Sequence, residues 1–344
     1  MPEKITIHEI ARRCSVSPST VSLVLNGKPG ASAATRSLIL ETARQLGYGE
    51  RGGVVLQSGP LHTLGLLVKT DLVGGQLPPS NPFYSKVITG VDLACQDLGI
   101  NLLFAMLPVD ADNRPVKLPP LLENNLADAV LMVGTFLDET VSAALRERSL
   151  PVVLVDGYSD TESYDMVVSD NFRAAYQAVE YLLRLGHRHI GFVGGAADCY
   201  PSLRERRNGY LRALKENGIA ETYLADCNVV HSHGDDEAAG LLAQHPHLTA
   251  LVGVNDDIAL GCIRAARRMG LRVPEDVSVI GYDDTDLAAR ASPPLTTMHV
   301  DTVAMGQGAV HLMLLRMRQP EAARITLSIH PTLVVRESTG APRG

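Results

Sequence analysis

Short apolar segments alternate with amphipathic segments from Leu61 onward, and this alternation constrains the fold more than any other feature. The apolar segments include LGLLV, DAVLMVG, PVVLVD, HIGFVGG, ALVGVND and VSVIGYD. Alternating strands and helices predict parallel sheets covered by helices on both faces. About ten strand candidates are too many for one typical sheet. The sequence therefore predicts an α/β body made of two lobes.

Residues 1–48 have a different pattern, which predicts helices near 7–14, 18–26 and 33–46. Thr6 and Glu9 have the spacing of a capping box, Ser17 precedes Pro18 as an N-cap, and Ser32 precedes the third helix. Only a few residues separate the first two helices, which is typical of a helix-turn-helix. The expected core of this small domain is Ile10, Ala11, Val16, Val21, Val24, Leu25, Ile39, Ala43 and Leu46.

The segment SVSPSTVSLVLNGK places a leucine where the helical pattern does not bury it. On a helical wheel Val21, Val24 and Leu25 form one apolar stripe. Leu23 falls on the opposite face, among serines. The local pattern therefore leaves Leu23 available for a contact outside the core of this N-terminal domain, which we call the head.

Charge is unevenly divided along the chain. Residues 1–60 contain seven Lys or Arg and four Glu, whereas the remainder contains 24 basic and 34 acidic residues. A basic head on an acidic body favours a polyanion partner for the head alone. A solvated charged face is the alternative interpretation.

The termini and cysteines indicate a cellular location. The N-terminal segment MPEKITIHEIARRC has no apolar signal region, and no apolar run approaches the roughly 18 residues that span a membrane. The five cysteines are odd in number and widely spaced, so we interpret them as reduced. We expect a cytoplasmic protein without a membrane partner.

The motifs of common enzymes are missing from the sequence. HRHIGFVGG lacks the G-x-G-x-x-G spacing of a dinucleotide site, and the sequence contains no G-x-S-x-G and no P-loop. His231 and His233 have no supporting metal-ligand spacing, and we interpret them as loop residues. We therefore expect no enzymatic activity, no cofactor and no metal site.

The head, ITIHEIARRCSVSPSTVSLVLNGKPGASAATRSLILETARQLGY, resembles the DNA-binding domain of the lactose-repressor (LacI/GalR) family of bacterial transcription regulators. NPFYSKVITGV, RRNGYLRAL, VNDDIALG, DVSVIGYDD and PPLTTMHVD follow in the family's order, so the resemblance covers nearly the whole chain. It implies a body like a periplasmic sugar-binding protein, in which the chain crosses three times between two lobes.

The resemblance also implies domain boundaries. It gives a helix-turn-helix domain over 1–48, a Gly-rich hinge or linker over 49–60 and an effector-binding and dimerisation domain over 61–340. One lobe takes about 61–168 plus 300–320. The other takes about 169–299 plus 321–340.

The resemblance assigns polar side chains of the head to the DNA backbone. These are Thr6, Ser17, Thr20, Asn26, Ser32 and Thr35. Ser19, Ser22 and Leu23 lie on the exposed face of the second helix and are candidates for further DNA contacts. We expect Leu23 to contact an apolar groove surface such as a thymine methyl group. The alternative is that Leu23 packs within the protein, against the hinge or a neighbouring subunit.

The hinge departs from the family pattern because glycines replace part of its usual helix-forming segment. Leu56 lies where family members carry a leucine that wedges into the minor groove. Adjacent glycines each cost about 1 kcal/mol in a helix. Leu56 is thus a candidate wedge, and a flexible tether without insertion is the alternative.

The resemblance assigns the effector to polar groups at strand ends, where parallel sheets commonly bind ligands. Planar groups with several donors or acceptors suit a hydroxylated ligand. The candidate residues are Phe83, Asp156, Ser202, Arg206, Asn255 and Asp283.

Together these features predict a homodimeric repressor of double-stranded operator DNA, controlled allosterically by a small molecule, most simply a sugar or sugar derivative. Two heads would enter successive major grooves, and effector and operator affinities would be coupled. The C-terminus lacks the leucine heptads of a tetramerising tail. The alternatives are a free-standing cytoplasmic sugar-binding protein and an α/β enzyme with a regulatory DNA-binding head.

Overall fold

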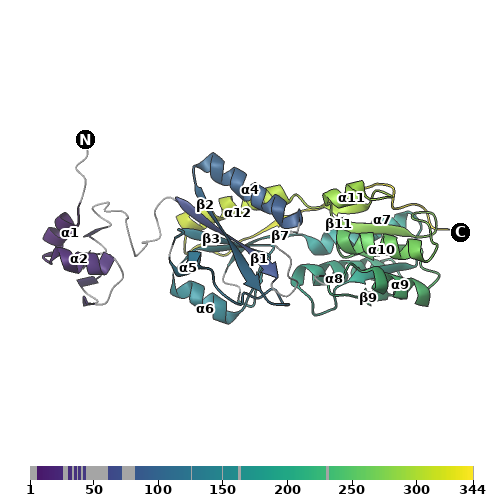
Figure 1. Cartoon of the computed structure of the whole chain (residues 1–344), viewed down its shortest axis with the longest axis horizontal. Coiled ribbons are helices and arrows are strands. Elements are labelled where there is room, and N and C mark those ends of the chain that lie inside the picture. The colour runs from purple at the N-terminus through teal and green to yellow at the C-terminus, as the bar shows by residue number, and fades with distance from the viewer. Residues whose placement is uncertain are drawn as a thin grey trace. The chain divides into compact units, whose positions relative to one another are not determined.

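The computed structural model describes residues 6–25, 30–32, 35–36, 38–39, 42–43, 61–71, 82–124, 126–148, 150–161, 164–229 and 232–343. The chain divides into two compact units, Met1–Pro60 and Leu61–Gly344 (Figure 1). Among the described residues, no helix combines the length and the apolar character that crossing a membrane requires. Asn26, Leu46, Leu56 and the predicted hinge over 49–60 lie outside the described residues.

The head begins with two short helices, α1 (Ile7–Cys14) and α2 (Pro18–Leu25). Ser15 between them has a left-handed backbone conformation, with φ 53°. This conformation ends α1 and reverses the chain within three residues. Residues 35–36, 38–39 and 42–43 are also helical. The first two predicted helices are confirmed, and the described part of the third agrees with its prediction.

Apolar side chains from all three helical segments form the small core of the head. The buried members are Ile10, Ala11, Cys14, Val21, Val24, Ile39 and Ala43. Val16 is partly buried against this core, and Cys14 is a member that the sequence analysis did not include. Val21 and Val24, the members of the second helix's apolar stripe whose side chains are described, therefore face inward as predicted.

The first lobe of the body is built on a six-stranded sheet with the strand order β13-β7-β5-β3-β1-β2, and every neighbouring pair is parallel. Its strands are β1 (Thr63–Asp71), β2 (Asn101–Val109), β3 (Ala129–Val133), β5 (Val152–Val155), β7 (Asp165–Ser169) and β13 (Thr326–Ile329). A separate parallel pair is formed by β4 (Phe136–Leu137) and β6 (Tyr158–Ser159).

Helices cover both faces of this first sheet (Figure 1). Its helices are α4 (Pro82–Leu98), α5 (Pro120–Glu123), α6 (Glu139–Glu147) and α12 (Thr302–Arg318). Leu66 and Val68 of β1 belong to the core beneath α4 and α12, whereas Leu67 belongs to the core beneath α5 and α6. Successive strand residues point to opposite faces, so a fully apolar strand is buried on both sides.

The second lobe has a second six-stranded sheet, with the order β14-β12-β11-β10-β8-β9. Its strands are β8 (Ile190–Gly194), β9 (Tyr223–Asp226), β10 (Ala250–Gly253), β11 (Ser278–Asp283), β12 (Thr296–His299) and β14 (Thr332–Val334). Only the edge pair β12 and β14 is antiparallel. Two parallel-sheet lobes were predicted from the sequence, and both are present.

The second sheet is also covered on both faces. Its helices are α7 (Asn171–Arg184), α8 (Pro201–Glu216), α9 (Asp235–Gln244), α10 (Asp256–Arg268) and α11 (Asp286–Arg290). Within β8, the Phe192 ring lies 5.3 Å from the Tyr210 ring of α8, whereas a β-carbon on Gly191 would contact Leu241 of α9. These adjacent residues therefore face helices on opposite sides of the sheet.

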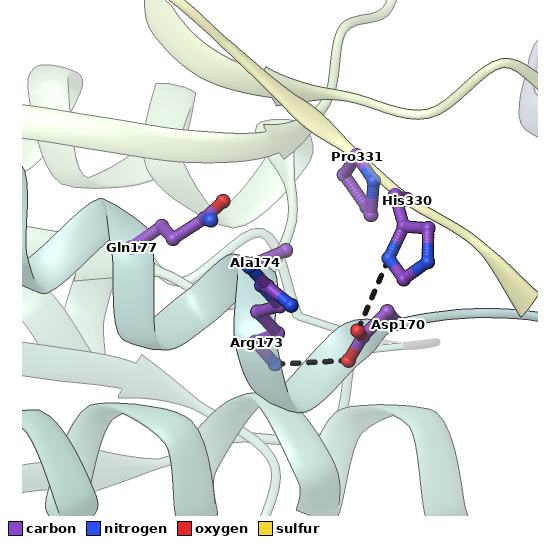
Figure 2. A pocket seen from close by; sticks show the side chains of 6 residues that line it. All are labelled: Asp170, Arg173, Ala174, Gln177, His330 and Pro331. Carbon is purple, nitrogen blue, oxygen red and sulfur yellow. Dashed lines mark hydrogen bonds and ion pairs between the residues drawn. The ribbon is translucent and has the colours of Figure 1, made fainter.

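The chain passes between the lobes three times: after β7, after β12 and after β13. Asp170 lies at the first crossing and His330 at the third, with 3.3 Å between His330 Nδ1 and Asp170 Oδ2 (Figure 2). They line a pocket of about 220 Å³. Its other lining residues are Arg173, Ala174, Gln177 and Pro331.

The third crossing corrects one predicted boundary. The sequence analysis placed residues 321–340 in the second lobe, but β13 pairs in parallel with β7 of the first sheet. The buried carboxylate of Asp165 explains this placement, because it accepts both Nε and Nη2 of Arg316 and the backbone N–H of Ile325. The crossing therefore falls at residues 330–331 rather than near 320.

Candidate DNA-binding and effector sites

Exposed hydroxyl groups gather at the N-terminus of α2. Ser17 Oγ accepts the backbone N–H of Thr20 at 3.1 Å, which makes Ser17 the predicted N-cap. Ser17 Oγ also lies 2.7 Å from Ser19 Oγ and 2.8 Å from Thr20 Oγ1. A helix N-terminus with exposed N–H and O–H donors is suited to a phosphate group.

The same motif is repeated at the next helical segment. Ser32 Oγ accepts the backbone N–H of Thr35 at 3.1 Å and lies 2.8 Å from the Thr35 hydroxyl. Ser32 is exposed and Thr35 is half-buried. The predicted cap at Ser32 is confirmed, and its hydroxyl pair repeats the geometry of Ser17 and Thr20.

The predicted capping box at the first helix is wrong. Thr6 precedes α1 in an extended conformation, but its side chain makes no capping hydrogen bond. The Glu9 carboxylate instead pairs with Arg12 and Arg13. Those contacts lower the pKa of Glu9, the Arg12 hydrogen bond contributing most. Thr6 remains exposed at the start of the head.

Leu23 lies outside the core of the head, as the wheel predicted. Its side chain is half-buried, and its Cδ1 lies 3.5 Å from the point that a β-carbon on Gly30 would occupy. Ser22, its neighbour in sequence, is also half-buried. Leu23 therefore lies near Gly30, and part of its surface stays accessible.

In the body, Arg206 of α8 is the residue around which the candidate effector groups gather. It is buried, its Nε donates to Asn171 Oδ1 at 2.9 Å, and its Nη1 donates to the Val254 carbonyl at 2.8 Å. Its Nη2 lies 3.3 Å from Asp283 Oδ1. These contacts fix the guanidinium plane at the carboxyl end of the second sheet. Ser202 is buried one turn earlier on the same helix.

Asp283 ends β11 and faces Arg206. Its backbone has φ 108°, a conformation that L-residues rarely adopt. Burial raises the pKa of the Asp283 carboxyl to about 8, although Arg206 acts in the opposite direction. A carboxyl group in this state can accept or donate hydrogen bonds near neutral pH.

Asp156 provides the opposing carboxyl group from the first lobe. It follows β5, is buried and accepts the Tyr84 hydroxyl at 2.9 Å. Burial raises the pKa of Asp156, while the nearby Lys69 and Arg206 oppose the shift. Arg206 thus opposes the burial-driven rise in the pKa of both Asp156 and Asp283.

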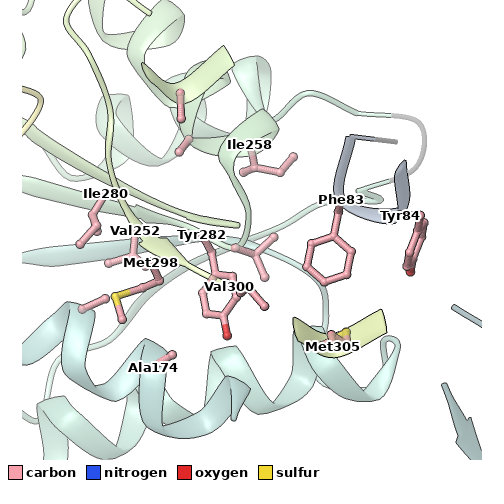
Figure 3. Close-up of a cluster of buried hydrophobic side chains, with 14 of the residues drawn as sticks. Phe83, Tyr84, Ala174, Val252, Ile258, Ile280, Tyr282, Met298, Val300 and Met305 are labelled. Carbon is pink, nitrogen blue, oxygen red and sulfur yellow. The ribbon is translucent and has the colours of Figure 1, made fainter. Parts of the chain in front are cut away.

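Aromatic rings from both lobes surround these charges. Phe83 and Tyr84 of α4 meet edge to face, with ring centroids 5.4 Å apart. Figure 3 shows these two side chains in the same buried cluster as Tyr282 of β11. Tyr200 reaches from the second lobe to the first, where its hydroxyl donates to the Asp156 carbonyl at 2.8 Å. Phe83 is thus placed with the other candidate effector residues.

Some buried polar atoms in this region have no hydrogen-bond partner among the described residues. They include the hydroxyls of Thr135 and Tyr158 and the Oδ1 atom of Asp283, which lies in an ion pair with Arg206 Nη2 at 3.3 Å but accepts no hydrogen bond from the described residues. Buried polar atoms are nearly always hydrogen-bonded in folded proteins. These atoms are therefore candidates for contacts with a polar ligand.

Asn255 has a structural contact that the sequence analysis did not foresee. Its Oδ1 accepts the backbone N–H of Ile258 at 2.9 Å, so Asn255 is the N-cap of α10. The next residue, Asp256, is buried and accepts the Thr285 backbone N–H and the Thr297 hydroxyl. Asp256 thereby anchors the segment that follows Asp283.

Comparison with known proteins shows which family this chain resembles. Residues 6–49 match "Bacterial regulatory proteins, lacI family", and residues 179–339 match a "Periplasmic binding protein-like domain". The PurR transcriptional repressor of Aliivibrio salmonicida is 31% identical over 337 residues, covering 97% of this chain and 98% of the relative. The ribose operon repressor of Haemophilus influenzae is 33% identical over 341 residues, with the same two coverages.

The chain belongs to the LacI family. This LacI-family protein is a DNA-binding transcriptional regulator whose DNA affinity is controlled by a small-molecule effector. Two solved structures are similar over almost the whole chain. The regulator CelR in complex with cellobiose is 27% identical with a TM-score of 0.67, covering 97% of this chain and 99% of that one. The Lac repressor dimer bound to operator and the anti-inducer ONPF is 25% identical with a TM-score of 0.65, covering 98% and 100%.

Three residues of this LacI-family protein that the sequence analysis missed lie next to residues that it named. Tyr84 follows Phe83, Tyr282 precedes Asp283, and Asp256 follows Asn255. These three missed residues belong to the motifs NPFY, GYDD and VNDD, which the sequence analysis had already singled out. Lys69, whose Nζ lies 5.4 Å from the Tyr84 ring centroid and 5.3 Å from that of Tyr200, had no such signal.

Proposed function

We propose that the protein is a homodimeric repressor whose effector is a sugar or sugar derivative bound between the two lobes. The observation that carries this proposal is the group formed by Arg206, Asp283 and Asp156. It combines a guanidinium, fixed by its bonds to Asn171 and Val254, with carboxyl groups from both lobes. Such a set matches the alternating donors and acceptors of a polyhydroxylated ring.

The aromatic rings support the same ligand class. Phe83, Tyr84, Tyr200 and Tyr282 offer flat apolar faces beside the polar groups. A pyranose or furanose ring has apolar C–H faces and a polar rim, so it is complementary to both kinds of surface. The cellobiose complex and the ribose operon repressor among the relatives agree with a sugar effector.

For the DNA, we propose that two clusters of hydroxyl-bearing residues, one at each of two helix N-termini, contact the DNA together with Leu23. Ser17, Ser19, Thr20, Ser32 and Thr35, together with Thr6, Ser22 and Asn26, form the set for the backbone and nearby bases. Leu56 is proposed as a minor-groove wedge. The proposed domains are a head over 1–48, a linker over 49–60 and a body from 61 to about 340.

The effector assignment is tested by thermal-shift screening. Sugars, sugar phosphates and nucleobases are each added to the wild type, to Arg206→Ala and to the matched control Arg212→Ala. Arg212 is an exposed residue on the same helix and pairs with Glu216. We expect a sugar to raise the Tm of the wild type and of R212A, but not of R206A. A response to nucleobases alone would contradict the sugar assignment.

DNA recognition is tested with the purified full-length dimer and a randomised duplex library. We expect enrichment of a near-palindromic site whose occupancy changes when the effector is added. Equal affinity for every duplex, with and without each metabolite, would refute the proposed function.

A further inference from the structure

Two histidines and a glutamate meet at the end of the second lobe that lies opposite the effector groups. His189, Glu221 and His247 precede β8, β9 and β10, respectively. These strands are parallel neighbours in the order β10-β8-β9, so their amino ends share one edge of the sheet. The effector groups lie at the carboxyl ends of the same sheet.

The three side chains present their ligand atoms to a common point. One such atom of each residue lies within 4.8 Å of the others, and all three residues are exposed. The His189 Nδ1 atom lies 3.9 Å from Glu221 Oε2. The His189 and His247 rings are nearly perpendicular, with centroids 4.8 Å apart.

The hydroxyl group of Tyr223 lies within hydrogen-bond distance of all three ligand groups. His247 Nε2 lies 2.8 Å from the hydroxyl oxygen and His189 Nδ1 lies 3.4 Å from it. The hydroxyl donates to Glu221 Oε2. Two imidazole nitrogens and a carboxylate oxygen are therefore already directed to one place by a residue whose body is buried in the lobe.

We propose that His189, Glu221 and His247 form a binding site for a divalent transition metal ion of the zinc class. Two imidazoles and one carboxylate are a common ligand set for zinc, with bond lengths of about 2.0–2.2 Å. Tetrahedral coordination at these lengths places ligand atoms roughly 3.3–3.6 Å apart. Small rotations of exposed side chains bring the observed separations into this range. Water or the Tyr223 hydroxyl takes the fourth position.

A bound ion would connect three segments that are distant in sequence. His189 and Glu221 are separated by 32 positions, and Glu221 and His247 by 26. Binding to the folded state alone raises stability. This site is independent of the effector assignment, and its test uses no sugar or DNA.

The test uses the full-length, tag-free protein after treatment with a chelator. Zn²⁺ is titrated by calorimetry at about pH 7.5, and Co²⁺ absorption reports whether the ligands are nitrogen and oxygen or thiolate sulfur. The variants are His189→Gln, Glu221→Gln and His247→Gln. His311→Gln is the matched control, because His311 is an exposed histidine on α12 of the first lobe.

We expect one ion per chain for the wild type and for H311Q, with a nitrogen and oxygen type of Co²⁺ spectrum. Each of the three site variants should bind at least about tenfold more weakly, because a ligand is lost. Circular dichroism identifies any variant that fails to fold, and E221Q keeps an acceptor for Tyr223. The proposal is overturned if the wild type binds no stoichiometric ion, if the spectrum is that of thiolate ligation, or if folded H189Q and H247Q bind like the wild type.

Discussion

The guanidinium carbon of Arg206 lies 3.6 Å from the centroid of the Tyr282 ring, so the cation stacks on an aromatic face. Tyr282 in turn lies 2.9 Å, hydroxyl to hydroxyl, from Ser169 at the end of β7. Arg206 and Tyr282 belong to the second lobe and Ser169 to the first. The stacked pair therefore couples the proposed ligand-binding arginine to the junction of the lobes.

The pH dependence of stability should depend on Asp283. Its folded pKa of about 8 lies above the ordinary 3.8 because of burial, so the folded state retains a proton that the unfolded state releases. The stability that this proton provides is complete below about pH 4 and is lost as pH rises through about 8. We expect the Tm of the wild type, relative to Asp283→Asn, to fall by at least about 2 °C between about pH 5 and pH 9. Thermal unfolding of both proteins without effector measures this difference in Tm. Parallel profiles of Tm against pH for the wild type and D283N would contradict the prediction.

Tyr200 should contribute to effector affinity through its bond across the lobes. Its hydroxyl donates to the Asp156 carbonyl at 2.8 Å, with the Thr135 carbonyl at 3.2 Å. Tyr200→Phe removes this bond, and we expect effector affinity to fall about three- to tenfold, the value of one net hydrogen bond. Calorimetric titration with the effector from the screen measures it. Tyr181→Phe is the control because the Tyr181 hydroxyl bonds to Thr339 within one lobe, and equal losses in both variants would contradict the prediction.

Asp256 should be a positioning residue for the segment that carries Asp283. Asp256→Ala leaves the buried Thr285 N–H without its acceptor at 2.7 Å. We expect a loss of about 1–3 kcal/mol in the free energy of unfolding together with weaker effector binding. Asp256→Asn keeps one acceptor and should retain most of both properties. Urea unfolding and effector titration measure the changes, and the exposed neighbour Asp257 provides the control D257A. A D256A protein that matches D257A in both assays would exclude this role.

The pair formed by Arg316 and Asp165 should stabilise the first lobe. Both side chains are buried, and Arg316 also donates to backbone carbonyls that follow α12, including those of Gln319 and Ala322. Arg316→Ala removes both guanidinium hydrogen bonds from the buried Asp165 carboxylate and leaves Arg324 Nη1, at 3.9 Å, as a more distant cation. We expect this change to cost about 3–5 kcal/mol. Urea unfolding of the full chain measures this loss. Arg318→Ala, at an exposed position on the same helix, should change stability little. Similar midpoints for the two variants would show that the buried pair is not required.

Leu23 should affect which bases are preferred rather than how strongly the phosphates are held. An apolar contact to a thymine methyl carries sequence information but releases no counterions. We expect Leu23→Ala to change the base preference of the selected operator while leaving the salt dependence of binding almost unchanged. Binding measured over a range of salt concentrations, on the selected operator and on single-base variants, distinguishes the two effects. A large change in the salt slope would assign Leu23 a different role.

Local patterns in the sequence determined the elements of this protein and their type. Fully apolar strands such as AVLMV of β3 can be buried only when both faces of a sheet are covered. Ser17 and Ser32 cap their helices because a side-chain oxygen three residues before a free N–H can reach it without tertiary help. The wheel likewise excluded Leu23 from the core, because the position of a residue around a helix follows from its number alone.

Tertiary structure decided which side chains meet. Residues 321–329 joined the first lobe because Asp165 and Arg316 meet across 151 positions of sequence. Arg206 meets Asp283, and His189 meets His247, only because parallel strands bring like ends to one edge of a sheet. Separation along the sequence does not predict those distances, because the order of strands in a sheet is set by packing rather than by sequence order.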